Sequence, residues 1–189
     1  MNLKPLKSSF IFFFVFDVTS SGLFEKGSTS SGIIMKASFD ESAKMPRWVN
    51  VLAVGPDCEG IVAGDVVLLP NLRWTEHFKH DGEKYWRSEE KEIVAKQTME
   101  GKNMDAVGEF VIFMKRATPK PEGTSLIIMS GLGETPHGIA VKVGPKVADM
   151  TVGVKMYYDG TNFSNDFEMQ GLKFSFIKES EVILVVDNV

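Results

Sequence analysis

Short runs of apolar residues, separated by glycine, proline and aspartate, recur along the whole chain. The runs are about four to eight residues long and rich in valine, isoleucine and phenylalanine, and none extends into the 3.6-residue period of an amphipathic helix. This pattern predicts an all-β protein. The expected strands cover residues 10–16, 49–54, 65–69, 84–86 and 92–95 in the first half, and 109–115, 138–143, 155–158, 172–177 and 182–186 in the second.

The two halves of the chain also resemble each other. Each begins with an apolar run, passes through an Ile-Ile-Met triplet and a Val-Gly-Pro sequence, and ends in a segment that contains glutamate. The offset between matching residues changes only inside polar stretches, where surface loops tolerate insertions at little entropic cost. We therefore expect a tandem repeat. The matches are residues 10–13 with 110–113 (offset 100), 31–35 with 125–129 (offset 94), 51–56 with 140–145 (offset 89), and Glu89 and Ile93 with Glu179 and Ile183 (offset 90).

Five expected strands in roughly 90 residues are typical of a small barrel, because closing a sheet removes its exposed edges. We expect two tandem, partly open β-barrels, residues 1–96 and 105–189, joined by a linker at 97–104. A linker of this length reaches at most about 3.3 Å per residue, so the two barrels should be near neighbours.

Charge and composition narrow the class of partner. The net charge of -4 and the pI near 5.5 disfavour generic binding to nucleic acid or to a membrane surface. The single Cys58 excludes an internal disulfide and fits a cytoplasmic location. The apolar run at residues 10–16 imitates the core of a signal peptide, but its counterpart at 110–114 lies in the middle of the chain, which favours a strand.

The two Ile-Ile-Met triplets are the candidate binding sites. Serine, glycine, threonine or proline flank both triplets, and both lie in the region where the repeats differ most in length. We expect each triplet to be the apolar tip of a mobile polar loop that docks into a partner; the alternative is that the triplets are ordinary buried strand residues. The candidate residues are Gly32, Ile33, Ile34 and Met35 in the first copy and Leu126, Ile127, Ile128 and Met129 in the second.

The ordered features resemble those of the small co-chaperonin family, the GroES-like lids of chaperonin rings. Residues 1–6 resemble the opening strand of that family, and residues 32–35 resemble the tip of its mobile loop. Residues 51–55 followed by 62–67 resemble its paired strand motif, and residues 88–90 and 178–183 resemble its closing segment. The likeness covers nearly the whole chain twice.

Several departures refine this resemblance. Only residues 56–61 and 145–150 stand where bacterial members have a roof hairpin, so we expect a lid without a closed roof, similar to the bacteriophage co-chaperonins. The second copy has Leu126 in place of the glycine before the triplet and Val154 in place of the aspartate after Gly153, which makes its docking less secure.

The resemblance implies a co-chaperonin that caps an ATP-bound, GroEL-like chaperonin ring and encloses an unfolded substrate chain, with a phage capsid protein as a candidate. It implies a homo-oligomeric ring, no cofactor, no metal and no enzymatic activity, and a location in the host cytoplasm if the gene is a phage gene. Family lids are sevenfold rings of single barrels. Paired barrels therefore leave two arrangements open: one barrel per chain in a seven-membered ring, or three or four chains that imitate the ring.

Two other classes of function remain open. The first is a structural or assembly β-protein that self-associates through its apolar triplets. The second is a single-stranded nucleic-acid binder that uses the aromatic residues within 73–87, although packing against a neighbouring subunit is the expected role of that segment. His77, His80 and Asp81 could contribute metal ligands but are expected to be a solvated loop, and no nucleophile, base and orienting group share a recognisable spacing.

Overall fold

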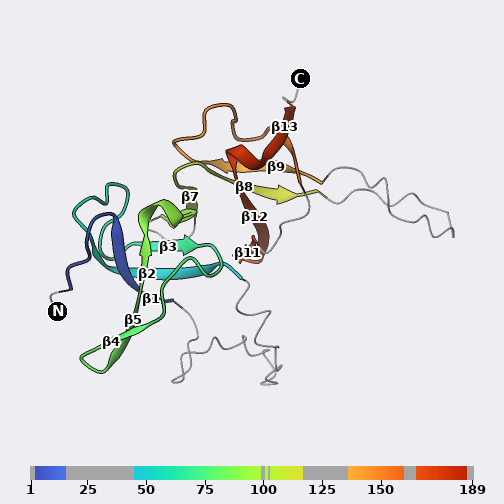
Figure 1. Cartoon of the computed structure of the whole chain (residues 1–189). Coiled ribbons are helices and arrows are strands. Elements are labelled where there is room, and N and C mark those ends of the chain that lie inside the picture. The colour runs from blue at the N-terminus through green and yellow to red at the C-terminus, as the bar shows by residue number, and fades with distance from the viewer. Residues whose placement is uncertain are drawn as a thin grey trace, which may run out of the picture.

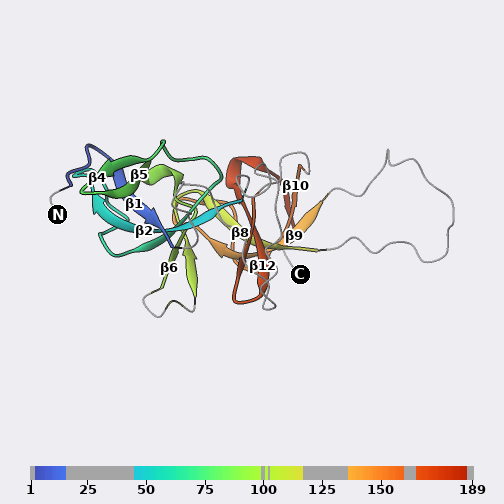
Figure 2. The ribbon, with the colours of Figure 1, turned by 90° about the horizontal axis from the view of Figure 1, so that it is seen from below.

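The computed structural model describes residues 3–15, 45–98, 101, 103–116, 136–159 and 165–186. Its regular structure consists of two antiparallel sheets and two single turns of 3-10 helix, so the protein is all-β, as predicted. The two sheets lie side by side, the first in blue to green and the second in yellow to red (Figures 1 and 2). No helix in the described ranges is long and apolar enough to cross a membrane.

The first sheet has seven strands in the order β4-β5-β1-β2-β3-β6-β7, and the second has six in the order β11-β12-β8-β9-β10-β13. The strands of the first sheet are β1 (Ser9–Phe14), β2 (Arg47–Val54), β3 (Val66–Leu69), β4 (Phe78–His80), β5 (Glu83–Glu89), β6 (Ala95–Gln97) and β7 (Met104–Ala106). Those of the second are β8 (Phe110–Lys115), β9 (His137–Val143), β10 (Lys155–Tyr158), β11 (Asp166–Met169), β12 (Leu172–Lys178) and β13 (Val182–Val186). The 3-10 turns η1 (Glu90–Glu92) and η2 (Glu179–Glu181) precede β6 and β13. Apart from β7, the two sheets have the same strand order.

Recurring hydrogen bonds correct the register of the repeat near the start of each half. The backbone N–H of Gly55 donates to the carbonyl oxygen of Ser9 at 2.8 Å, and that of Gly144 donates to Phe110 at 2.9 Å. The irregular step that follows Ile11 in β1 also follows Ile112 in β8. Ser9 therefore corresponds to Phe110, and the offset is 101 rather than 100. The sequence alone does not distinguish the two offsets, because four successive apolar residues match equally well at 100 and at 101.

A second correction concerns the end of each half. The carboxylate of Glu90 accepts hydrogen bonds from the backbone N–H groups of Glu59 and Gly60, at 3.1 and 2.5 Å. Glu179 accepts the matching pair from Ala148 and Asp149, at 2.9 and 2.8 Å. The counterpart of Glu179 is thus Glu90, not Glu89, and the offset there is 89 rather than 90. The offset of 89 predicted for residues 51–56 is confirmed and holds from β2 to β6.

Most expected strands are present, but three short ones were missed. Strands β4 and β11 form hairpins with β5 and β12. Strand β7 pairs with β6 across the predicted linker at 97–104, whose end residues Gln97 and Met104 belong to these two strands. Residues 92–95, predicted as a strand, contribute only Ala95 to β6, because η1 occupies the preceding turn. Residues 55–65 and 144–154 are fully described and contain no strand.

The buried apolar residues form three clusters. One lies within the first half around Phe10, Phe12 and Leu69, and one within the second around Phe113, Met156 and Ile177. The third, which we call the shared cluster, contains residues of both halves. Its buried members are Leu68, Val94, Ala95, Met104, Ala106, Phe110, Ile112, Phe167 and Phe176.

Candidate functional site

Both candidate triplets, residues 32–35 and 126–129, lie outside the described residues. The structure does describe the strand ends from which the segments 16–44 and 117–135 start and to which they return. The first segment connects β1 to β2, and the second connects β8 to β9. The candidate site is therefore described through the base of each connection. By base we mean the two strand ends at which the connection leaves and re-enters its sheet.

The two bases have equivalent backbone geometry. At the first, the N–H of Val15 donates to the carbonyl oxygen of Trp48 at 3.1 Å. At the second, the N–H of Arg116 donates to His137 at the same distance. Each connection thus leaves and re-enters its sheet at neighbouring backbone positions, and both triplets are carried between equivalent antiparallel strands.

The side chains at the first base are aromatic. The ring of Phe14 lies edge-on to Trp86, with centroids 4.8 Å apart, and edge-on to Trp74, with centroids 5.3 Å apart. The ring of His77 lies 6.0 Å from Trp86 across the β4–β5 hairpin. Edge-to-face ring pairs of this kind add about 0.5–1.5 kcal/mol beyond the burial of their area. The strand ends of the first connection are therefore fixed by apolar packing.

The equivalent residues at the second base are polar. Phe14, His77 and Trp86 correspond to Lys115, Asp166 and Ser175. The ammonium group of Lys115 lies 2.6 Å from the Asp166 carboxylate, and the Ser175 hydroxyl donates to the same carboxylate at 2.6 Å. An exposed ion pair of this kind contributes about 1 kcal/mol or less and weakens with salt. The two bases thus share a backbone but differ in side-chain chemistry at three matched positions.

Part of the aromatic segment 73–87 packs within the chain, whereas its packing against a neighbouring subunit stays a prediction. Tyr85 and Trp86 are each 8% exposed, and Trp74 packs on the cluster of the first half. Only Phe78, at 36%, keeps a largely accessible ring. A surface on which nucleic-acid bases could stack is therefore reduced to a small part of the predicted set.

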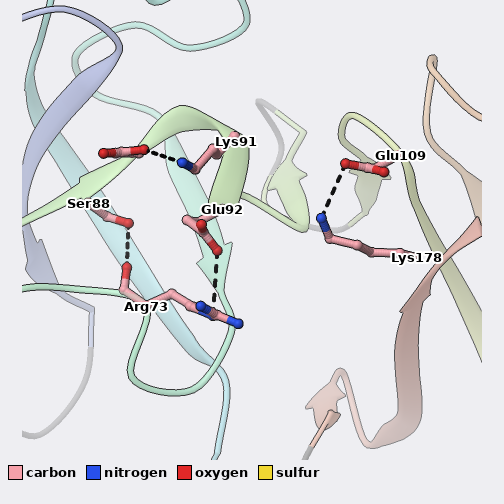
Figure 3. Close-up of polar contacts among 7 residues, drawn as sticks. Arg73, Ser88, Lys91, Glu92, Glu109 and Lys178 are labelled. Atoms are coloured by element: carbon pink, nitrogen blue, oxygen red, sulfur yellow. Dashed lines mark hydrogen bonds and ion pairs between the residues drawn. The ribbon is translucent and has the colours of Figure 1, made fainter. Parts of the chain in front are cut away.

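Charges of both signs surround the hollow beside this segment (Figure 3). Arg73 lies 3.6 Å from Glu92, and its carbonyl oxygen accepts a hydrogen bond from the Ser88 hydroxyl at 2.5 Å. The ammonium group of Lys91 lies 2.7 Å from Glu89, and this hydrogen bond lowers the pKa of the Glu89 carboxyl. Because acidic partners balance these cations, the hollow does not present the cationic surface that a phosphate backbone requires.

The residues considered for metal or nucleophilic chemistry have ordinary structural surroundings. His80 ends β4, and Asp81 stands in the following hairpin turn with its carboxylate 3.4 Å from the His80 ring. Within the described ranges, no group of three histidine, cysteine, aspartate or glutamate side chains could hold a metal ion. The Cys58 thiol donates to the carbonyl oxygen of Ser9 at 3.6 Å, and burial raises its pKa, which disfavours the reactive thiolate.

Comparison of the chain with protein-family models and with curated proteins gave no match.

Proposed function

We propose that the chain is a tandem co-chaperonin, in which each sheet belongs to a GroES-like, partly open barrel and carries an apolar loop tip. In this proposal, the tips dock onto an ATP-bound, GroEL-like chaperonin ring, and the lid encloses an unfolded substrate protein, a phage capsid protein being the candidate. The protein itself hydrolyses nothing and needs no cofactor.

The observation that carries the proposal is the repeated context of the triplets. Two polar segments, each with an apolar triplet, connect equivalent pairs of antiparallel strands, β1 to β2 and β8 to β9. Equivalent backbone hydrogen bonds close both connections at 3.1 Å. Serine, glycine, threonine or proline flank both triplets, and both lie where the repeats differ most in length, which supports a docking role over a buried strand. The absence of strands in residues 55–65 and 144–154 supports a lid of the roofless, phage-like type.

Docking by a single triplet would be weak. Burying an isoleucine or methionine side chain contributes about 1.5–3 kcal/mol, and fixing the backbone of each loop residue costs about 1–2 kcal/mol. Several loops that act together raise the effective concentration and bind tightly, while release can still follow when the grooves of the ring move. This balance suits a lid that must bind and leave within one ATP cycle.

A co-sedimentation experiment with a GroEL-like ring tests the proposal. The wild-type chain should sediment with the ring in the presence of ATP and remain in the supernatant without nucleotide. The double change Ile33→Ser and Ile34→Ser should abolish this binding, because it removes most of the apolar surface of the first tip. The far-UV circular dichroism of the variant should match that of the wild type, which separates lost docking from lost folding.

The matched control is Ile127→Ser with Ile128→Ser in the second copy. We expect a smaller loss than in the first copy, because Leu126 replaces the glycine before that triplet. If the first double variant caps the ring as well as the wild type does, the first triplet is not the docking element. If the wild-type chain ignores the ring but forms oligomers that the same changes dissolve, the self-associating assembly protein is the correct class.

A further inference from the structure

The hollow beside the aromatic segment is large enough for a small molecule. It lies between residues 72–75 and residues 87–92 and has a volume of about 310 Å³, within the range of about 300–1,000 Å³ in which small ligands bind. Hydrogen bonds join its two sides: the N–H of Thr75 donates to the carbonyl oxygen of Arg87 at 2.9 Å, and the Ser88 hydroxyl donates to that of Arg73 at 2.5 Å (Figure 3). The shape of the hollow is therefore set before any ligand arrives.

Three cations and two carboxylates line this hollow. Arg73 pairs with Glu92, and Lys91 pairs with Glu89 (Figure 3). Arg87 is exposed, and no ion pair joins it to another side chain within the ranges that the structure describes. The hollow thus has one cation more than it has carboxylates.

The charge of Arg87 acts inside the hollow. The pKa of the Glu89 carboxyl is lowered chiefly by its hydrogen bond with Lys91, and the positive charges of Arg87 and Lys7 lower it further. The guanidinium of Arg87 is therefore close enough to attract an anion bound in the hollow, while Lys91 already holds the nearest carboxylate.

One wall of the hollow is apolar. Trp74 is half-buried, and its ring is fixed from behind by Phe14, with the two centroids 5.3 Å apart. Leu72, which is 63% exposed, lines the same wall. An indole face beside a guanidinium suits a ligand that combines an aromatic or aliphatic group with a negative charge.

The second half does not repeat this set of charges. At the offset of 89, Arg87 corresponds to Phe176, which is 2% exposed in the shared cluster, and Lys91 corresponds to Ser180. The second half nevertheless forms the equivalent strands and the equivalent 3-10 turn. The fold of the repeat therefore does not require the cations of the hollow.

We propose that the hollow binds a carboxylate that carries an aromatic or aliphatic group. The guanidinium of Arg87 donates hydrogen bonds to the two carboxylate oxygens, which match its planar, forked arrangement of N–H groups. The apolar group of the ligand packs against Trp74 and Leu72. One uncompensated cation suits a single carboxylate, whereas a phosphate backbone needs several. This inference goes beyond the proposed function and does not depend on it.

Two sources supply this chemistry: a free small carboxylate and the carboxyl terminus of a peptide chain. Phenylacetate is the probe for the first source. N-acetylphenylalanine is the probe for the second, because it keeps the ring and the carboxylate and adds the amide group of a peptide terminus. Tighter binding of N-acetylphenylalanine would assign the hollow to peptide termini, and tighter or equal binding of phenylacetate would assign it to free carboxylates.

Nuclear magnetic resonance of the full, ¹⁵N-labelled chain at constant ionic strength tests the site. Phenylacetate should shift the indole N–H signal of Trp74 saturably, with a dissociation constant of about 1 mM. The signal of Trp48, which packs on the shared cluster, should stay in place and serves as the internal control. Phenylacetamide has the same shape without the charge and should bind at least about tenfold more weakly.

A pair of charge-matched variants tests the role of Arg87. Arg87→Gln should raise the dissociation constant of phenylacetate by about tenfold or more, because it removes the charged donor. Lys79→Gln removes the same charge from the exposed strand β4, outside the hollow, and should bind as the wild type does. Both residues are exposed, so both variants should fold, and unchanged indole signals without ligand check this.

Three results would each overturn the proposal. The first is that neither carboxylate shifts the Trp74 signal at concentrations up to about 20 mM. The second is that phenylacetamide binds as tightly as phenylacetate. The third is that the Arg87→Gln variant binds as tightly as the Lys79→Gln variant. Because these measurements need no chaperonin, their failure is distinguishable from failure of the docking experiment.

Discussion

At the scale of single residues, two glutamates perform the same task in the two halves. Glu90 and Glu179 each accept two backbone hydrogen bonds from the segment between the second and third strands of their half. These contacts cross about thirty positions of sequence, and each ties a chain segment without regular structure to the 3-10 turn that precedes β6 or β13. Glu90 and Glu179 belong to the closing segments, residues 88–90 and 178–183, that resemble a family motif. In the structure, the two carboxylates have a local structural role.

Removing either carboxylate should lower stability. We expect Glu90→Ala and Glu179→Ala each to reduce the free energy of unfolding by about 1–2 kcal/mol, because two backbone donors lose a charged acceptor. The measurement is urea denaturation followed by circular dichroism. Glu90→Gln and Glu179→Gln are the matched controls: both backbone donors reach Oε1 in each half, so an amide oxygen can keep both bonds and the loss should be smaller. Equal losses in the alanine and glutamine variants would contradict this role.

At the scale of elements, the β4–β5 and β11–β12 hairpins use the same two-residue turn with different residues. Asp81 and Gly82 have φ values of 51° and 84°, and Gln170 and Gly171 have 54° and 74°. Such turns require positive φ at both central residues, which suits Asp-Gly and penalises residues with longer side chains. The second hairpin therefore carries a local strain that the first largely avoids.

Exchanging the first turn residue should change stability in opposite directions. Gln170→Asn should raise the free energy of unfolding by about 0.5–1 kcal/mol, because asparagine tolerates the left-handed conformation better than glutamine does. Asp81→Gln should lower it by a similar amount. Chemical denaturation of the two single variants measures both effects. A destabilised Gln170→Asn variant would show that side-chain contacts of Gln170 outweigh its backbone strain.

The elements that were predicted correctly are those with a strong local pattern. Runs such as residues 110–115 bury four successive apolar side chains, so their composition alone indicates a strand. The missed strands are only three or four residues long. All three residues of β4 are exposed, and the alternation in β7 and β11 covers too few residues to mark a strand. The Asp81-Gly82 pair was a visible hairpin signal, but the polar sequence around it favoured a loop. Register could not be read from apolar runs, because a shift of one residue keeps the composition and only the hydrogen-bond partners reveal it.

At the scale of the whole molecule, the shared cluster joins the two halves. Leu68 and Val94 of the first half pack with Phe110 and Phe176 of the second, and the Trp48 ring lies edge-on to Phe167 with centroids 6.3 Å apart. The sequence predicted near neighbours but no contact surface, because these partners are far apart along the chain and no local pattern pairs them.

The shared cluster should make the two halves unfold together. The three tryptophans, Trp48, Trp74 and Trp86, all belong to the first half, but the Trp48 ring contacts Phe167 of the second. In a Trp48→Phe background, the fluorescence of Trp74 and Trp86 therefore reports on the first half alone. Phe176 is 2% exposed and belongs to the second half, and Phe176→Ala should cost about 3–5 kcal/mol. We expect the denaturation midpoint seen by tryptophan fluorescence to fall together with the midpoint seen by circular dichroism.

Met156→Ala separates coupling from direct contact, because Met156 is 0% exposed and packs only in the cluster of the second half. If the halves form one cooperative unit, this change also lowers the tryptophan midpoint although it touches no residue of the first half. A tryptophan transition that ignores both variants while circular dichroism develops an earlier second step would mean that the halves unfold independently. In that case the shared cluster would hold the halves in position without coupling their stabilities.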